Sequence, residues 1–173
     1  TSTVETGSLY GTYALATAGL TTTIADAADY TISGFFGTDT AYISAEAGAR
    51  DVASAFNLVA GNTGVTATAE TRARLTVSAA ETFSFDLYGK SSTASKVVAV
   101  NSDTSDLTNL KDAINAVSGS TGITATLTSD KAGVNVINPE GYTIYFADAT
   151  AVGGGNANLN VSLTNGATES DTV

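Results

Sequence analysis

Apolar and polar residues alternate along many short stretches of the chain, a pattern typical of β-strands that bury one face. In TGVTATAE, Val65, Ala67 and Ala69 fall on one side and the intervening threonines on the other. Comparable stretches predict strands at residues 29–33, 40–43, 65–69, 74–77, 82–88, 96–100, 123–127, 133–137, 142–146 and 157–163. Residues 9–20 are less periodic, and we expect a partly extended segment that pairs with the C-terminal strand.

Two stretches instead show helical spacing, with apolar residues at i, i+3, i+4 and i+7. The apolar stripes are Val52, Ala55, Phe56 and Val59 in residues 47–60, and Leu107, Leu110, Ile114 and Val117 in residues 106–118. Ser105 or Asp103 is expected to cap the second helix, and Asp106 suits its positive end. Gly61 and Gly119 follow the last apolar residues, where left-handed caps are expected.

The chain repeats itself at a spacing of 58 residues. TGVTATAE at residues 63–70 returns as TGITATLT at residues 121–128, and the match extends back through the preceding helix. The identical pairs include Ala55/Ala113, Asn57/Asn115, Val59/Val117 and Gly61/Gly119. Because the match spans a helix, a turn and a strand, it indicates a duplicated structural unit.

Each unit reads β-β-α-β-β, which predicts an α+β fold of two tandem units. We expect mostly antiparallel sheets, each covered by one helix, with extra C-terminal strands. The predicted organisation is a partly extended linker over residues 1–28, a first unit over 29–80, a second over 81–148, and a C-terminal strand and linker over 149–173. One such unit buries little surface alone, so two packed units are favoured. The Gly153–Gly155 run is expected to be a flexible turn between the last strands.

The stretch DLTNLKDAINAVSGSTGITATLTSDKAGVNV (residues 106–136) resembles the "IN" repeat motif in the outer domains of bacterial flagellins and in hook-associated and filament-cap proteins. A weaker copy, RDVASAFNLVAGNTGVTATAETRARLTV, covers residues 50–77, with Phe56 where the motif has Ile. With the preceding strands, the resemblance covers roughly residues 30–146.

This resemblance implies an extracellular, surface-exposed segment of a secreted flagellar filament protein. In such a protein the long terminal helices that assemble the filament, and that contact other flagellin subunits, lie outside the segment. We therefore expect a fragment that is itself a monomer. The absence of an initiating Met and of a signal peptide agrees with that expectation.

Composition and charge exclude or disfavour several classes of function. The 173 residues include no Cys, His, Met or Trp, so disulfides and thiolate or imidazole ligands for zinc or iron–sulfur clusters are excluded within the chain. Seventeen acidic residues against seven basic ones give a net charge of −10, with no basic cluster. Binding to nucleic acid or to an anionic membrane is therefore disfavoured. No apolar run is long enough to span a membrane.

Acidic pairs are the first candidates for a site. Asp103 with Asp106, and Asp26 with Asp29, are spaced to ligate a hard cation, but neither pair belongs to a calcium-loop motif. We interpret them as solvated or helix-capping residues. Paired carboxylates for sugar cleavage would need a cleft with aromatic residues, whereas the aromatic residues here fall mostly in predicted strands and are expected to pack.

Nucleophile and phosphate motifs are also incomplete. Ser91, Ser92 and Ser95 lie near Lys96 but without a nucleophile-elbow signature. The Gly153–Gly155 run lacks the ending of a phosphate-binding loop. Asn160 begins a formal glycosylation sequon that we interpret as chance, and exposed Ser and Thr offer O-glycosylation without a local code. The sequence therefore predicts no catalytic, cofactor-binding or metal-binding residue.

Three hypotheses follow. The leading one is a structural outer domain that gives a filament an acidic, hydrated surface. The alternative is a binding module of a hook-associated or cap protein, or of an adhesin that recognises glycans or a host. An exposed aromatic patch would favour the alternative, and Phe35-Phe36 is its best candidate, although packing against the edge of the first sheet is the simpler interpretation. An enzyme is third, because no residue set supplies nucleophile, base and oxyanion donor together.

Overall fold

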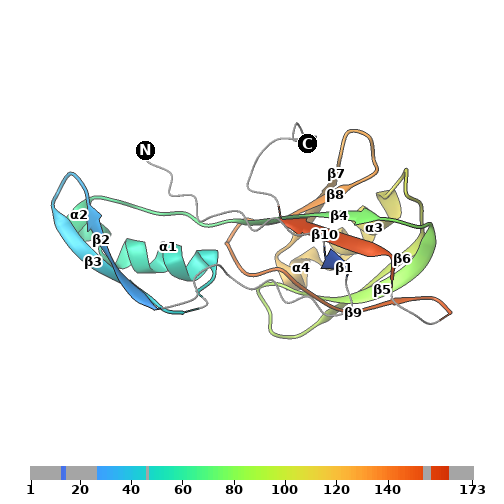
Figure 1. Ribbon diagram of the computed structural model, residues 1–173, viewed down its shortest axis with the longest axis horizontal. Helices are drawn as coiled ribbons and strands as arrows, with labels where there is room; N and C mark the ends of the chain where they lie inside the picture. The colour runs from blue at the N-terminus through green and yellow to red at the C-terminus, as the bar shows by residue number, and fades with distance from the viewer. Residues whose placement is uncertain (1–12, 15–26, 46, 154–156, 164–173) are drawn as a thin grey trace.

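A computed structural model describes residues 13–14, 27–45, 47–153 and 157–163 (Figure 1). The fold is α+β, as predicted, and within these residues all strand pairs are antiparallel. The strands are β1 (Tyr13–Ala14), β2 (Ala28–Ser33), β3 (Thr38–Ile43), β4 (Thr71–Val77), β5 (Glu81–Tyr88), β6 (Ser95–Ser102), β7 (Thr124–Leu127), β8 (Val134–Asn138), β9 (Tyr145–Ala151) and β10 (Leu159–Leu163). The helices are α1 (Ala49–Leu58), α2 (Ala60–Thr63), α3 (Thr108–Ala116) and α4 (Ser118–Thr121).

The larger part of the molecule, which we call the large lobe, holds two sheets around one core. Its sheets have strand orders β1-β10-β4-β8-β7 and β6-β5-β9. Helix α3 packs against β6 and β7, so it bridges an edge strand of each sheet. Alternate residues of the strands point inward. Among the described residues, the fully buried large side chains all belong to this lobe: Leu75, Phe83, Phe85, Leu87, Leu107, Leu110, Ile114, Ile123, Ile144, Phe146 and Leu159.

The smaller part, residues 27–45 and 47–70, which we call the small lobe, is the β2-β3 hairpin covered by α1 (Figure 1). Its buried apolar side chains are Ala41, Ile43, Ala47 and Ala53. None of these belongs to the core cluster of the large lobe. The small lobe therefore has a thin core of mostly small residues, and its stability per residue is expected to be lower.

The start of α1 docks on the large lobe at residues 138–142. The Arg50 N–H donates to the Gly141 carbonyl at 3.3 Å, and its guanidinium donates to the Glu140 carbonyl at 3.3 Å. The guanidinium also lies 4.3 Å from the Tyr142 ring centroid. Gly141 has φ +74°, and a Cβ there would lie 2.5 Å from that of Ala69. This tight turn explains why the strand predicted at residues 142–146 begins only at Tyr145.

The two predicted units differ in how they end. In the second, β7 folds back onto β8 as predicted. In the first, residues 64–70 form no strand, contrary to the prediction, and β4 pairs with β8 and β10 in the large lobe. The two copies differ because only the second has residues that favour a turn at this point. The β7-β8 connection contains Asp130, Gly133 and Lys131 at φ 59°, whereas residues 66–73 contain no Gly, Pro, Asn or Asp.

The helix ends also differ from the prediction. A short helical turn, α2 or α4, follows each main helix. The left-handed caps are therefore Gly64 (φ 74°) and Gly122 (φ 70°). Gly61 and Gly119 lie within the short turns instead. Asp103 and Ser105 do not cap α3, whose N-cap residue is Leu107.

The first and last described strands are neighbours. Tyr13 pairs with Val161 and Ala14 with Asn160 in the β1-β10 ladder. This confirms the predicted pairing of the opening segment with the C-terminal strand. The first and last described strands thus lie side by side at one edge of the large lobe.

Candidate functional site

The residues shared by the two repeats meet where each main helix passes the extended segment that follows it. The Asn115 side chain donates to the Ala125 carbonyl at 2.9 Å and accepts the Ala125 N–H at 2.8 Å. Asn57 makes the same two bonds with Ala67, each 2.9 Å. A side-chain amide thus replaces a neighbouring strand for one residue, which fixes the helix against the extended segment. This is the physical role of the Asn in the repeated motif.

A second shared cluster closes the turn after the helix. The Thr121 hydroxyl donates to the Val117 carbonyl at 3.0 Å and accepts the Ile123 N–H at 3.2 Å. Thr63 makes the corresponding bonds to Val59 and Val65 at the same distances. These matched contacts support the duplication that the sequence predicts. They satisfy backbone groups and leave no reactive group exposed, so the repeated residues hold the fold together.

Removing the Asn amide should affect the two copies unequally. We expect Asn115→Ala to lower the free energy of unfolding by about 2 kcal/mol, because the half-buried N–H and C=O of Ala125 lose their partners. Asn57→Ala should cost at most about 1 kcal/mol, because water can reach Ala67. Urea unfolding of both variants measures the difference. Equal losses would show that burial does not distinguish the two copies.

The acidic candidates are surface residues with local partners. Asp103 accepts the Ser105 N–H at 3.2 Å. Asp106 accepts both the N–H and the hydroxyl of Thr108, and lies 3.7 Å from the Lys131 ammonium. Asp29 is exposed on β2, and Asp26 lies outside the described residues. No group of three or more Asp, Glu, His or Cys that could hold a metal occurs among the described residues.

Hydrogen bonding lowers the pKa of several of these carboxyl groups. The pKa of Asp106 lies below 3.8 chiefly because the Thr108 hydroxyl and N–H donate to it. Ser105 lowers the pKa of Asp103, mainly through its N–H, and the Thr128 hydroxyl does so for Asp130. The pKa of Asp39 falls through the Asn62 amide and the Thr40 N–H. Ionisation of these groups therefore strengthens the hydrogen bonds that they accept.

Stability should therefore fall only in acid. A carboxyl group whose folded pKa is depressed contributes stability above its unfolded pKa, near 3.9, and loses it as the pH drops through the folded value. We expect the thermal midpoint to be level from about pH 8 to 5 and to decline below about pH 4. The drop should be small because these groups are exposed. Changing Asp103 and Asp106 together to Asn should reduce the drop, and an unchanged profile would remove these two turns as its cause.

The serine and glycine candidates do not form a site. The Lys96 ammonium pairs with Asp86 at 3.2 Å. The Ser95 hydroxyl lies 2.8 Å from that of Ser120, and the Ser91 hydroxyl accepts the Thr93 N–H at 3.0 Å. Ser92 is exposed in the same loop. The lysine is therefore engaged by a carboxylate and is not placed to deprotonate a serine.

The two remaining motifs lie near the last strand. Gly153 has φ +105°, as a turn residue would, and residues 154–156 lie outside the described part of the chain. Asn160 is half-buried in β10 and pairs with Thr76. Its sequon therefore lies within a sheet and is not a loop acceptor.

No protein-family model matches the chain, and no curated protein does. In the part of the chain that the structure describes, no helix is long and apolar enough to cross a membrane.

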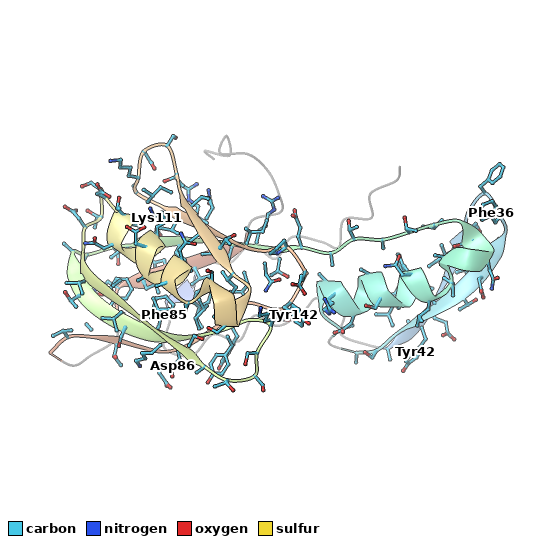
Figure 2. The ribbon with its side chains drawn as sticks, turned by 180° about the vertical axis from the view of Figure 1, so that it is seen from behind. Phe36, Tyr42, Phe85, Asp86, Lys111 and Tyr142 are labelled. Carbon is cyan, nitrogen blue, oxygen red and sulfur yellow. The ribbon has the colours of Figure 1, made fainter. Side chains whose placement is uncertain are left out.

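The aromatic pair Phe35-Phe36, the candidate for a binding patch, is exposed to solvent. Phe35 and Phe36 form the turn of the β2-β3 hairpin and are 94% and 70% exposed. Their rings meet edge to face with centroids 5.5 Å apart. The interpretation that both side chains pack against the sheet edge is therefore wrong. The Phe36 ring does lie close to the backbone of Gly64, where an added Cβ would be 2.9 Å from the ring. Figure 2 shows Phe36 at the end of the small lobe farthest from the large lobe.

This tip is held in shape by backbone bonds. The Gly34 N–H donates to the Gly37 carbonyl at 2.8 Å, and the Phe36 N–H donates to the Thr63 carbonyl at 3.2 Å. The Asn62 amide donates to Asp39 at 2.7 Å. Gly34 packs directly on the Thr63 carbonyl, so a larger residue there would displace the tip. The tip thus presents two aromatic rings on an ordered turn.

Further exposed apolar side chains were not singled out from the sequence. Tyr42, Leu58 and Val152 are 63%, 87% and 77% exposed. Leu58 could have been found, because it falls outside the apolar stripe of its helix. Tyr42 alternates with the buried Ala41 and Ile43 and so belongs to the outer face of the hairpin.

Proposed function

We propose that the chain is a structural, surface-exposed outer segment of a bacterial flagellar filament protein, without catalytic activity. The observation that carries the proposal is the β1-β10 ladder, in which Tyr13 faces Val161. A module whose first and last strands lie side by side can be inserted into another part of a chain without distorting it. The segment would then project from the filament and form its outer surface.

Two further observations support this proposal. The motif residues that resemble the flagellar repeat, Asn57 and Asn115, bind backbone groups in the same way in both copies. The net charge of −10 also suits a crowded polymer surface, where like charges limit sideways aggregation.

The test is deletion from the parent protein. In the bacterium that makes the chain, residues 13–163 of the full-length protein would be replaced by a short Gly/Ser linker. Since the segment would lie outside the assembling part, we expect filaments of normal length and smaller outer diameter under the electron microscope. Loss of all filaments would contradict the proposal, and so would filaments of unchanged diameter.

A second candidate function, binding to a glycan or a host surface, is favoured by the exposed tip at Phe35 and Phe36. Aromatic faces are common in such contacts, and exposed apolar pairs mark interaction sites. Replacing both residues by Ser separates the two functions. The structural proposal expects unchanged filaments and unchanged attachment of bacteria to surfaces, whereas the binding function expects normal filaments with weaker attachment. Leu58→Ser, which removes another exposed apolar side chain, is the matched control.

A further inference from the structure

The small lobe leaves one extended segment unpaired that the large lobe pairs. In the second repeat, β7 is hydrogen-bonded to β8, with Thr124 opposite Ile137 and Thr126 opposite Asn135. The equivalent residues of the first repeat, Thr66 and Thr68, are exposed and make no hydrogen bond to any other described residue. Among the described residues, the same local structure thus carries a paired strand in one copy and an unpaired edge in the other.

The backbone direction of this edge is set by Asn57. Its amide binds both the N–H and the C=O of Ala67, so these groups point toward α1. Because successive residues of an extended chain direct their backbone groups to opposite sides, those of Thr66 and Thr68 point away from the helix. They form an open row of donors and acceptors.

The face beside this edge is also less covered than its equivalent. Gly34 and Gly89 are equivalent, because each lies directly on the carbonyl of the repeated Thr, Thr63 or Thr121. Four residues before these glycines stand Tyr30, which is 42% exposed, and Phe85, which is 0% exposed. Phe56 and Val65 are half-buried, whereas their counterparts Ile114 and Ile123 are fully buried. In the large lobe, the sheet that contains β8 and β4 covers this face. The small lobe has no such layer among the described residues.

The edge lacks the features that keep strands apart. Residues 63–69 contain no charge and no Pro, the two usual protections of an exposed edge. The segment is also self-complementary. When two copies run antiparallel about Ala67, Thr66 of each faces Thr68 of the other, and Val65 faces Ala69. Glu70 then faces Gly64, so like charges do not meet despite the net charge of −10.

The geometry points to a second copy of this chain as the occupant: residues 65–69 of two chains pair antiparallel about a two-fold axis through Ala67. Four backbone bonds form, two between each Thr66 and the opposing Thr68, and the uncovered faces of the two small lobes come together. A single strand pair buries much less than the 1,200–2,000 Å² of a stable interface, so the contact is weak in dilute solution. It becomes significant where chains are held close together, because tethering supplies roughly millimolar effective concentrations.

Cysteine trapping tests the register directly, because the chain has no Cys. Ala67 faces its own copy at a pair that is not hydrogen-bonded, where Cα atoms lie about 4.5 Å apart, within disulfide range. Thr66 is the control: it is more exposed, but the two copies of Thr66 are diagonal neighbours, with Cα atoms about 7–8 Å apart. At roughly millimolar concentration under mild oxidation, we expect at least about tenfold faster dimer formation by Ala67→Cys than by Thr66→Cys. Equal rates, or faster trapping of Thr66→Cys, would overturn the proposal.

Amide hydrogen exchange of the unmodified chain gives an independent test. The Thr66 and Thr68 amides should exchange freely in dilute solution and become protected as the concentration rises. Protection that is already full at micromolar concentration would show that another part of the same chain covers the edge. No protection at any concentration would show that the edge stays open. Either result contradicts pairing with a second copy.

Discussion

Phe85→Ala should be among the most damaging single substitutions in the chain, lowering the free energy of unfolding by about 3–5 kcal/mol. Phe85 is fully buried, and its ring lies 6.2 Å from that of Phe83 and 5.6 Å from that of Phe146. Truncation removes its apolar contacts and leaves a cavity between the two sheets, which strands on both sides prevent from closing. Urea unfolding followed by circular dichroism measures the loss.

Tyr30→Ala is the matched control, because Tyr30 holds the equivalent place in the first hairpin. It is 42% exposed, so we expect a loss of about 1 kcal/mol or less. The contrast follows because no described residues form a second layer over the small lobe, as they do over the large one. Equal losses at both positions would show that the small lobe is as well covered as the large one, and would contradict the interpretation of an incomplete first repeat.

Gly89→Ala should destabilise the large lobe by about 3 kcal/mol through a steric clash. A Cβ on Gly89 would lie 2.1 Å from the Thr121 carbonyl oxygen and 3.1 Å from Ile123 Cδ1. The oxygen cannot retreat without weakening the 2.9 Å bond that it accepts from the Lys90 N–H. Thermal unfolding should show a clear drop in the midpoint.

Gly119→Ala serves as the control for that substitution. Gly119 lies in the helical turn α4, and a Cβ there would meet nothing within 4 Å. Because Ala favours helix over Gly, we expect a gain of up to about 1 kcal/mol. A drop of similar size in both variants would mean that loss of backbone freedom, and not the contact with Thr121, governs the effect.

Periodicity alone predicted most of the fold. Strict alternation identified β2, β5, β6 and β8 within one or two residues. In β5, β6 and β8 the alternating apolar residues form a buried face, whereas β2 has no buried residue. The helical stripes identified α1 and α3. The repeat at 58 residues correctly indicated two related units, since Asn57 and Asn115 make equivalent contacts.

Pairing between distant strands could not be predicted in the same way. Alternation in residues 65–69 shows that one side is apolar, but not whether a neighbouring strand exists. The partner of β4 depends on whether the chain turns after Ala69, and only the absence of turn residues over 66–73 indicated that it does not. The cap glycines were misplaced by three residues because the short turns α2 and α4 carry almost no apolar signal.

The candidate site was predicted only in part. The sequence drew attention to Phe35-Phe36. However, two adjacent aromatic residues give the same sequence pattern whether their side chains are buried or exposed to solvent. Their exposure follows from the tight turn between Gly34 and Gly37, a three-dimensional property. Of the acidic pairs, which were interpreted as solvated or helix-capping residues, Asp103 and Asp106 are surface residues that accept local hydrogen bonds, but Asp103 does not cap α3. Asp26, of the second pair, lies outside the described residues.

The central claim, that this segment forms the exterior of a filament, is tested most directly by labelling. Leu58, 87% exposed, would be changed to Cys in the full-length protein, and a thiol-reactive gold label imaged on intact bacteria. Since this chain has no Cys, the label on it marks one position. Our account expects label along the whole length of the flagellar filament. Label confined to the filament tip or the hook junction, or found elsewhere on the cell, would contradict it.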